Sequence, residues 1–434
     1  MTAAIISFVV LFALVGARVP IALALIVTGI GGYALIVNWP ATLGMVTTVL
    51  WDFSFAYTLS AIPLFVLMGN LVARSGIADD LFSAAQAYLG GRRGGLAVAT
   101  VVSCAGFGAI CGSSAATAAT MAKVAIPPMR KLGYHDRLSA ATVAAGGTLG
   151  ILIPPSILLL TYGVFTQTHI GKLFAAGLVP GLVGVAGYII AIRWSLWRRP
   201  ELAPPPGAGT EESARVKAGR LLRIWPVLAL FGLVMGGIYG GVMTSTEASG
   251  VGAFGAFILA LSRRGFSLRA LYAVLIDSGR LSAVIFAIIL GAACYAEFLN
   301  QSGIHRALTA TITGAGIPPY AVILMIIGIY ILLGCVLDSV ALVLLTIPLF
   351  FPVIVGLGYD PVWFGVLLVI VTELGLITPP IGVNLFVLQA STPGLNLRTI
   401  ILGIVPFIAV DIVRVLVIAF IPALSLWLPG VLFN

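Results

Sequence analysis

The sequence predicts an all-α polytopic membrane protein that contains an inverted repeat, and composition is the first reason. Of its 434 residues, 60% are hydrophobic and only 9% are charged, whereas a soluble domain is roughly half apolar and one quarter charged. Nearly the whole chain consists of mainly apolar stretches of about 20 residues, the length of one membrane span, so about ten crossings are expected. This composition excludes a soluble enzyme.

The glycine and proline content is the second reason. The chain has 51 Gly and 24 Pro residues, too many for a plain helical bundle. A bilayer tolerates helix breaks only where they lie inside protein or line a cavity. The sequence therefore predicts broken helices next to a cavity.

The third reason is that the apolar segments form two series separated by a polar stretch. The first repeat, 1–197, has segments at about 3–16, 20–37, 61–89, 96–126, 138–166 and 173–197, with an intervening stretch at 42–60. Met1 leads directly into an apolar run without a basic leader or a cleavage site, so the first segment is expected to be a retained span.

The polar stretch over 198–223 contains three consecutive prolines and six basic residues, which predicts a solvated linker. The second repeat, 224–434, has segments at about 224–242, 245–261, 281–300, 318–355, 362–390 and 399–427. An offset of 225 residues aligns the repeats. It pairs Ser114 with Ser339, Gly150 with Gly375, and Pro154-Pro155 with Pro379-Pro380.

The predicted topology follows from the long segments bounded by Gly and Pro. Segments 96–126 and 318–355 are interpreted as re-entrant hairpins, and 138–166 and 362–390 as broken helices. Each half then has five full crossings, and an odd number turns the second copy upside down, as in many secondary transporters. With the amino terminus outside, the basic loop residues other than Lys172 and Arg306 fall on the cytoplasmic side, as the positive-inside rule requires.

The duplicated double proline is the strongest candidate for a functional site. A Pro-Pro pair removes two backbone donors and cannot continue a regular helix, so carbonyls near Gly150, Ile153, Gly375 and Thr378 are expected to lack partners. Bare carbonyls and hydroxyls at half-helix ends suit a hard cation such as sodium. The alternative is a proline kink that serves only packing.

The hairpin tips are the second candidate. The first tip reads Gly106 to Thr117, rich in small residues, and the second reads Gly334-Cys335-Val336-Leu337-Asp338-Ser339. Helix starts present free amides and a positive dipole end, which would suit a carboxylate. Small residues at such spacing are also common in ordinary membrane helix packing.

Charged residues inside apolar segments are costly and usually functional. Asp338 is expected to ligate a cation or to cap the half-helix that starts at Ser339, and Lys123 to neutralise a substrate carboxylate or to snorkel to the surface. Arg74 is expected to pair with Asp79 or Asp80, and Arg414 with Asp411. These are interpreted as structural ion pairs.

Several classes of function are excluded by missing patterns. No GxxxxGK[ST] motif occurs, and the three histidines are far apart in the sequence, so neither ATP hydrolysis by a P-loop nor a catalytic site is indicated. The four cysteines have neither a CxxC pair nor a histidine cluster beside them, which argues against zinc and disulfides. The net charge of +9 is explained by cytoplasmic loops rather than by nucleic acid.

At these residues the sequence resembles the DctM-like family, the large membrane subunit of tripartite ATP-independent periplasmic (TRAP) transporters. The resemblance covers nearly the full chain. Its motifs are Ala17-Arg18-Val19-Pro20-Ile21-Ala22, Ile62-Pro63-Leu64-Phe65, Cys111 to Thr117, Ile151 to Ser156 and Gly375 to Asn384.

The resemblance implies an elevator-type sodium symporter in the bacterial inner membrane, with a periplasmic amino terminus. A transport domain would slide against a scaffold braced by a small four-helix membrane subunit. A periplasmic substrate-binding protein would deliver a small organic acid, such as a C4-dicarboxylate or a sialic-acid-like carboxylate. Sodium would be the coupling ion, and no other cofactor is implied.

The resemblance also implies roles for individual residues. One sodium site would use, mostly through carbonyls, Gly108, Cys111, Gly150, Ile153 and Pro155. Its inverted twin would use Gly334, Gly375, Thr378 and Ile381. Family members often have serines where Gly108 and Cys111 stand here, so the first site would offer backbone oxygens only. Candidates for substrate or supporting contacts are Ser113, Ser114, Asp338, Ser339 and Asn384.

Two other functions remain open at this point. An autonomous sodium–dicarboxylate symporter of the same architecture would work without the binding protein. An anion channel is disfavoured, because a pore needs no duplicated occlusion machinery.

Overall fold

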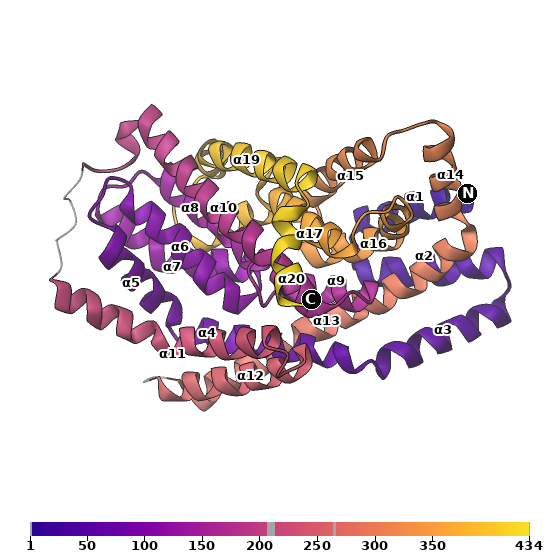
Figure 1. Cartoon of the computed structure of the whole chain (residues 1–434), viewed down its shortest axis with the longest axis horizontal. Helices are drawn as coiled ribbons and strands as arrows, with labels where there is room; N and C mark the ends of the chain where they lie inside the picture. Colours follow the sequence, from indigo (N-terminus) through magenta and orange to yellow (C-terminus); the bar gives the residue numbers. More distant parts are fainter. Residues whose placement is uncertain (1, 206–212, 264–265, 434) are drawn as a thin grey trace.

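The computed structural model describes residues 2–205, 213–263 and 266–433, and every regular element in these ranges is helical (Figure 1). The first half contains α1 (Thr2–Gly16), α2 (Ile21–Ile36), α3 (Trp39–Ser54), η1 (Tyr57–Ser60), α4 (Ala61–Arg74), α5 (Ile77–Leu89), α6 (Gly95–Cys111), α7 (Ser114–Lys131), α8 (Asp136–Leu152), α9 (Ile157–Thr166) and α10 (Ile170–Arg198).

The connection between the halves contains η2 (Pro200–Leu202). The second half contains α11 (Ala214–Tyr239), α12 (Ser245–Ser262), α13 (Leu268–Ser302), α14 (Ile304–Gly314), α15 (Pro319–Gly334), α16 (Ser339–Gly356), α17 (Pro361–Ile377), α18 (Val383–Ser391), α19 (Leu397–Phe420) and α20 (Ala423–Leu432). The predicted linker over 198–223 includes residues 206–212, which lie outside the described residues.

Seven helical segments in the described residues are long and apolar enough to cross a membrane. They are Tyr57–Arg74, Asp136–Thr166, Ile170–Arg198, Arg215–Tyr239, Leu268–Ser302, Ser339–Gly356 and Leu397–Phe420. The other apolar helices of the described residues are shorter, with 10–17 residues, and include α1, α2, α6 and α15. The chain is therefore an all-helical, multi-pass membrane protein, as the sequence predicts.

Several predicted segments have different bounds in the structure, and α11 begins at Ala214, inside the predicted linker 198–223. The expected segment 61–89 is two helices, because Gly76 has a left-handed backbone (φ 76°) between α4 and α5. The expected segment 281–300 is the end of the 35-residue helix α13. By the repeat offset, α13 is the continuous counterpart of α3, η1 and α4 together.

The two halves exchange packing partners. Helix α2 of the first half packs on α13, and α12 of the second half packs on α4. Small residues permit both contacts: a Cβ added at Gly29 would lie 2.7 Å from the backbone nitrogen of Tyr295, and one at Gly252 would lie 2.7 Å from the sulfur of Met68. Figure 1 shows α12 and α4 near the lower edge of the molecule, and α13 running beside α2 toward the right.

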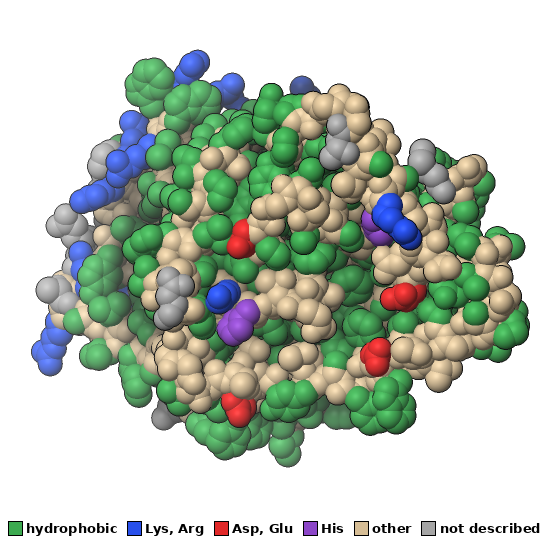
Figure 2. Space-filling model, turned by 45° about the vertical axis from the view of Figure 1, so that its right-hand side comes forward, with side chains coloured by type: hydrophobic (Ala, Val, Ile, Leu, Met, Phe, Trp, Pro, Cys, Tyr) green, Lys and Arg blue, Asp and Glu red, His purple; other side chains and the backbone are tan. Residues whose placement is uncertain are grey.

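Charged side chains are unevenly distributed over the surface. In Figure 2, Lys and Arg side chains gather along one side of the molecule, at the left of the view, while much of the remaining surface is hydrophobic. An apolar belt with cations gathered at one side is the pattern of a protein inserted in a membrane.

Candidate functional site

Helices α6 and α7 form a hairpin whose tip is Gly112-Ser113. Gly112 has a left-handed backbone (φ 66°) that ends α6, and the Ser113 hydroxyl accepts from the backbone nitrogen of Ala116 at 3.4 Å, which caps α7. Gly108 lies against Gly150 of α8 so closely that a Cβ at either residue would be 2.4 Å from the other's Cα. Because neither glycine has a side chain, the hairpin tip packs directly against the first broken helix.

Helices α15 and α16 repeat this arrangement. A Cβ at Gly375 of α17 would lie 2.7 Å from the Cα of Gly334. The carboxylate of Asp338 accepts from the backbone nitrogen of Val340 at 3.2 Å, so Asp338 caps α16. The capping interpretation of Asp338 is thus confirmed, while a cation at this carboxylate stays a prediction.

The helix breaks leave carbonyls without helical donors. Pro154 and Pro155 have no N–H, so the carbonyls of Gly150 and Ile151 have no donor four residues later. In the second break the same holds for Leu376, while the carbonyl of Gly375 accepts from the Thr378 nitrogen at 3.1 Å. Both breaks thus present backbone oxygens of the kind that sodium prefers.

The predicted sodium ligands fall into two groups in the structure. Gly108 and Cys111 end α6 beside Gly150, and the Gly108 carbonyl already accepts from the Gly112 nitrogen at 2.7 Å. In the second group, the Cys335 carbonyl at the hairpin tip accepts from Gly382 at 3.1 Å, which joins the tip to the break that holds Thr378 and Ile381. Each group joins one hairpin to one broken helix, and ion binding at these residues stays a prediction.

A cavity of about 90 Å³ lies where both hairpin tips and both breaks approach each other. All five predicted substrate contacts are among its lining residues: Ser113, Ser114, Asp338, Ser339 and Asn384. The amide nitrogen of Asn384 donates to the Ser114 hydroxyl, so a residue of the second half fixes a residue of the first tip. Leu281 and Ile285 of α13 also line the cavity.

The electrostatics of the cavity come from helix ends and one carboxylate. Its described lining contains Asp338 and no Lys or Arg side chain, while the first residues of α7 and α16 supply positive dipole ends. Lys123, a possible partner for a substrate carboxylate, is exposed and is not among the lining residues. The snorkelling interpretation therefore fits this residue.

A buried polar network connects the two broken helices behind the cavity. The Arg414 guanidinium lies 3.1 Å from the Glu373 carboxylate and 3.0 Å from the Asp411 carboxylate. The Tyr188 hydroxyl donates to Asp411 at 2.5 Å and lies 3.1 Å from the Thr148 hydroxyl. Thr148 and Glu373 stand two residues before Gly150 and Gly375, at equivalent positions of the repeats.

The Arg414–Asp411 pair is confirmed, but the roles of Glu373 and Tyr188 in this network were not predicted. The sequence feature that could have indicated the role of Glu373 is its charge within an apolar segment, because a buried carboxylate needs a cation. The expectation for Arg74 was wrong, because it ends α4 facing α13 and pairs with Asp277 at 2.7 Å. Asp80, beyond the turn at Gly76, pairs with Arg263 at 2.6 Å.

One cavity is surrounded by two hairpin tips and two broken helices, in a chain of long apolar helices. This arrangement defines the class of protein as a membrane permease with an internal repeat. The chain belongs to the family described as "Tripartite ATP-independent periplasmic transporter, DctM component", whose sequence profile matches residues 8–424. It is thus the large permease component of such a transporter.

Similar proteins support this membership. The C4-dicarboxylate TRAP transporter large permease protein DctM of Pseudomonas aeruginosa is 37% identical, and the match covers 92% of each chain. The isethionate TRAP transporter permease protein DctMQ of Oleidesulfovibrio alaskensis is 30% identical over 98% of this chain and 66% of that longer protein. The solved structure of the Alcanivorax borkumensis YdaH transporter has the same fold, with a TM-score of 0.64, 13% identity and coverage of 93% and 96%.

Proposed function

We propose that this permease takes up a small organic acid together with sodium, after a periplasmic substrate-binding protein has delivered the acid. The observation that carries the proposal is the cavity between the two hairpin tips, where five polar candidates from both halves converge. The size and polarity of this cavity suit a small polar solute rather than a large apolar one.

Charge balance favours an anion that binds together with a cation. The cavity has helix amino ends but no Lys or Arg in its described lining, and Asp338 adds a negative charge. An organic anion would therefore need cations close by to offset this carboxylate. The carbonyl groups at the two breaks are the natural places for them, at Gly150 to Pro155 and at Gly375 to Ile381.

The substrate class is proposed from chemistry and from the relatives. The relatives named above are described as transporters of C4-dicarboxylates and of isethionate, and both substrates are small organic anions. Helix starts recognise carboxylate or sulfonate groups without a dedicated arginine. We infer a small organic anion, with C4-dicarboxylates as the first class to test.

The proposed mechanism is an elevator movement. The hairpin tips and broken helices line the cavity together with Leu281 and Ile285 of the long helix α13. The hairpins and broken helices would move as one body along α2, α4, α12 and α13, carrying the cavity across the membrane.

Partners and location follow from the family. The family description is of a tripartite transporter, so a small membrane subunit and a periplasmic binding protein are proposed as partners. The DctMQ relative is longer, and the match covers 66% of it, which supports a small subunit fused to the permease in that protein. The chain would lie in the inner membrane with its amino terminus in the periplasm.

Uptake by proteoliposomes that contain the permease and the small subunit tests the proposal. Radiolabelled C4-dicarboxylates are added with or without the binding protein, and with or without an inward sodium gradient. The expected result is saturable uptake that requires both.

Two outcomes would replace this function by another. Undiminished uptake without the binding protein would show an autonomous symporter. Sodium-independent flux with single-channel current steps would show an anion channel.

A further inference from the structure

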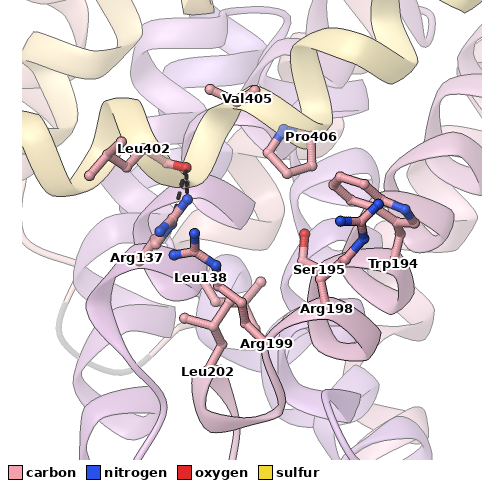
Figure 3. A pocket seen from close by; sticks show the side chains of 11 residues that line it. Arg137, Leu138, Trp194, Ser195, Arg198, Arg199, Leu202, Leu402, Val405 and Pro406 are labelled. Atoms are coloured by element: carbon pink, nitrogen blue, oxygen red, sulfur yellow. Dashed lines mark hydrogen bonds between the residues drawn. The ribbon is translucent and has the colours of Figure 1, made fainter.

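A second pocket lies away from the substrate cavity, where the start of α8, the end of α10 and the middle of α19 meet. It has a volume of about 350 Å³. Figure 3 shows Arg137 and Arg199 on one side of it, Arg198 and Trp194 on the other, and Leu402 and Val405 of α19 above them. The pocket is thus part cationic and part apolar.

The charge of this pocket is strongly one-sided. Three guanidinium groups line it, and no carboxylate is among its described lining residues. The Glu201 carboxylate is not part of the lining, although it is close enough to act on the charge of Arg137. A pocket with this charge attracts an anion.

The three arginines of the pocket differ in how many of their side-chain N–H groups already donate hydrogen bonds. Arg137 donates from Nε and Nη2 to the Leu402 carbonyl, at 3.0 and 2.6 Å. The Arg198 guanidinium lies over the Trp194 ring, 5.3 Å from its centroid. Within the described residues, the side chains of Arg198 and Arg199 form no hydrogen bond or ion pair that would occupy their N–H groups. Two guanidinium groups therefore remain for a ligand, and planar donor groups of this kind match phosphate oxygens.

The apolar wall continues out of the pocket. Leu402 and Val405 are 44% and 56% exposed, and the exposed face of α19 continues through Ile412, Leu416 and Phe420 at helical spacing. Exposed apolar residues in a membrane helix face lipid acyl chains. A ligand in this pocket would have its anionic group beside the arginines and an apolar part along α19.

We propose that this pocket binds the phosphate group of an anionic phospholipid, with an acyl chain along the exposed face of α19. The pocket contains three arginines and lies between membrane helices, and basic pockets of this kind on the cytoplasmic side bind lipid head groups. A free phosphate ester would share the arginine chemistry but would leave the apolar wall unused.

Native mass spectrometry of the purified full-length chain in detergent measures this binding directly. Phosphatidylglycerol and phosphatidylcholine are added separately to the natural sequence and to the double variant R198Q/R199Q. Because each arginine near a membrane surface contributes about 1 kcal/mol, the double variant is expected to bind phosphatidylglycerol roughly thirtyfold more weakly. Phosphatidylcholine binding should be weak in both proteins.

The matched control is R193Q/R223Q, which removes two exposed arginines outside the pocket lining. It changes the net charge equally and should retain phosphatidylglycerol binding. Size-exclusion profiles and melting temperatures of all variants establish that they are folded.

Three results would overturn the proposal. They are unchanged lipid binding in R198Q/R199Q, equal weakening in the control, and displacement of phosphatidylglycerol by equimolar glycerol phosphate. The third result would identify a soluble phosphate ester.

Discussion

In the first repeat, every residue from Gly150 through Ser156 is buried, whereas in the second repeat Pro380 and Ile381 reach the surface and Ile381 is 37% exposed. Both breaks contain a Pro-Pro pair and a close glycine contact to a hairpin. Helix α10 covers the first break, because a Cβ at Gly177 would lie 2.6 Å from the Leu152 carbonyl. Local sequence thus produces the break, and neighbouring helices decide whether it is enclosed.

Replacing Arg414 with leucine should have the largest effect on both breaks, because the network around it joins α8 to α17. The change leaves the carboxylates of Glu373 and Asp411 buried without a cation, which costs about 3–5 kcal/mol. Thermal unfolding of the purified protein measures the loss. The control Arg74→Leu removes the exposed pair with Asp277 and should cost at most about 1 kcal/mol; equal losses would contradict the structural role of the network.

Alanine at the two hairpin glycines should affect the first repeat more strongly. A Cβ at Gly108 would lie 2.4 Å from the Cα of Gly150, compared with 3.1 Å between a Cβ at Gly334 and the Cα of Gly375. Gly108→Ala should cost about 1–3 kcal/mol through overpacking, and Gly334→Ala less. Melting temperatures of the two variants give the order, and the reverse order would refute this account of the contacts.

Removing the cap of the first break should have a moderate effect. The Ser156 hydroxyl accepts from the Leu159 nitrogen at 3.1 Å and caps α9, whereas α18 begins at Gly382 without a side-chain cap. Ser156→Ala should destabilise the protein by about 1 kcal/mol, and Ser156→Gly by only a few tenths. Chemical or thermal unfolding would detect the difference, and identical values for the two variants would count against a capping role.

Thr378→Val at the exposed break should affect sodium dependence rather than stability. The Thr378 hydroxyl donates to the Leu374 carbonyl at 2.6 Å and adds an oxygen that Ile153 lacks at the first break. Its loss should raise the sodium concentration for half-maximal uptake about fivefold, equivalent to about 1 kcal/mol, with expression largely intact. Thr161→Val within α9 is the control, and an unchanged sodium response in Thr378→Val would remove this residue from the ion site.

Much of this fold could be predicted from the sequence, because repeated motifs show which positions of the two halves are equivalent. The offset that pairs Gly150 with Gly375 predicted helix breaks and hairpins at matched positions, and the structure has helix ends at these positions. Re-entry of the hairpins into a membrane stays a prediction. The same motifs selected Ser113, Ser114, Asp338, Ser339 and Asn384, which the structure brings around one cavity. Their contact with substrate stays a prediction.

Side-chain pairs between helices that are distant in the sequence could not be predicted, because they depend on how the helices pack. Arg74 was predicted to pair with Asp79 or Asp80, which are near in sequence. Because the chain turns at Gly76, Arg74 pairs with Asp277 instead. Tyr188 gave no signal, since a tyrosine in an apolar segment is usually a packing residue. The exposure of Ile381 and the burial of Ile153 also depend on neighbours that the repeat offset does not predict.

The exchanged packing of α2 on α13 and of α12 on α4 has an evolutionary consequence. Each half supplies one hairpin tip to the cavity, and Asn384 and Ser114 meet across the halves, so a single half cannot enclose it. A half-length ancestor could have enclosed such a cavity only as a dimer, before gene duplication and fusion joined the two copies.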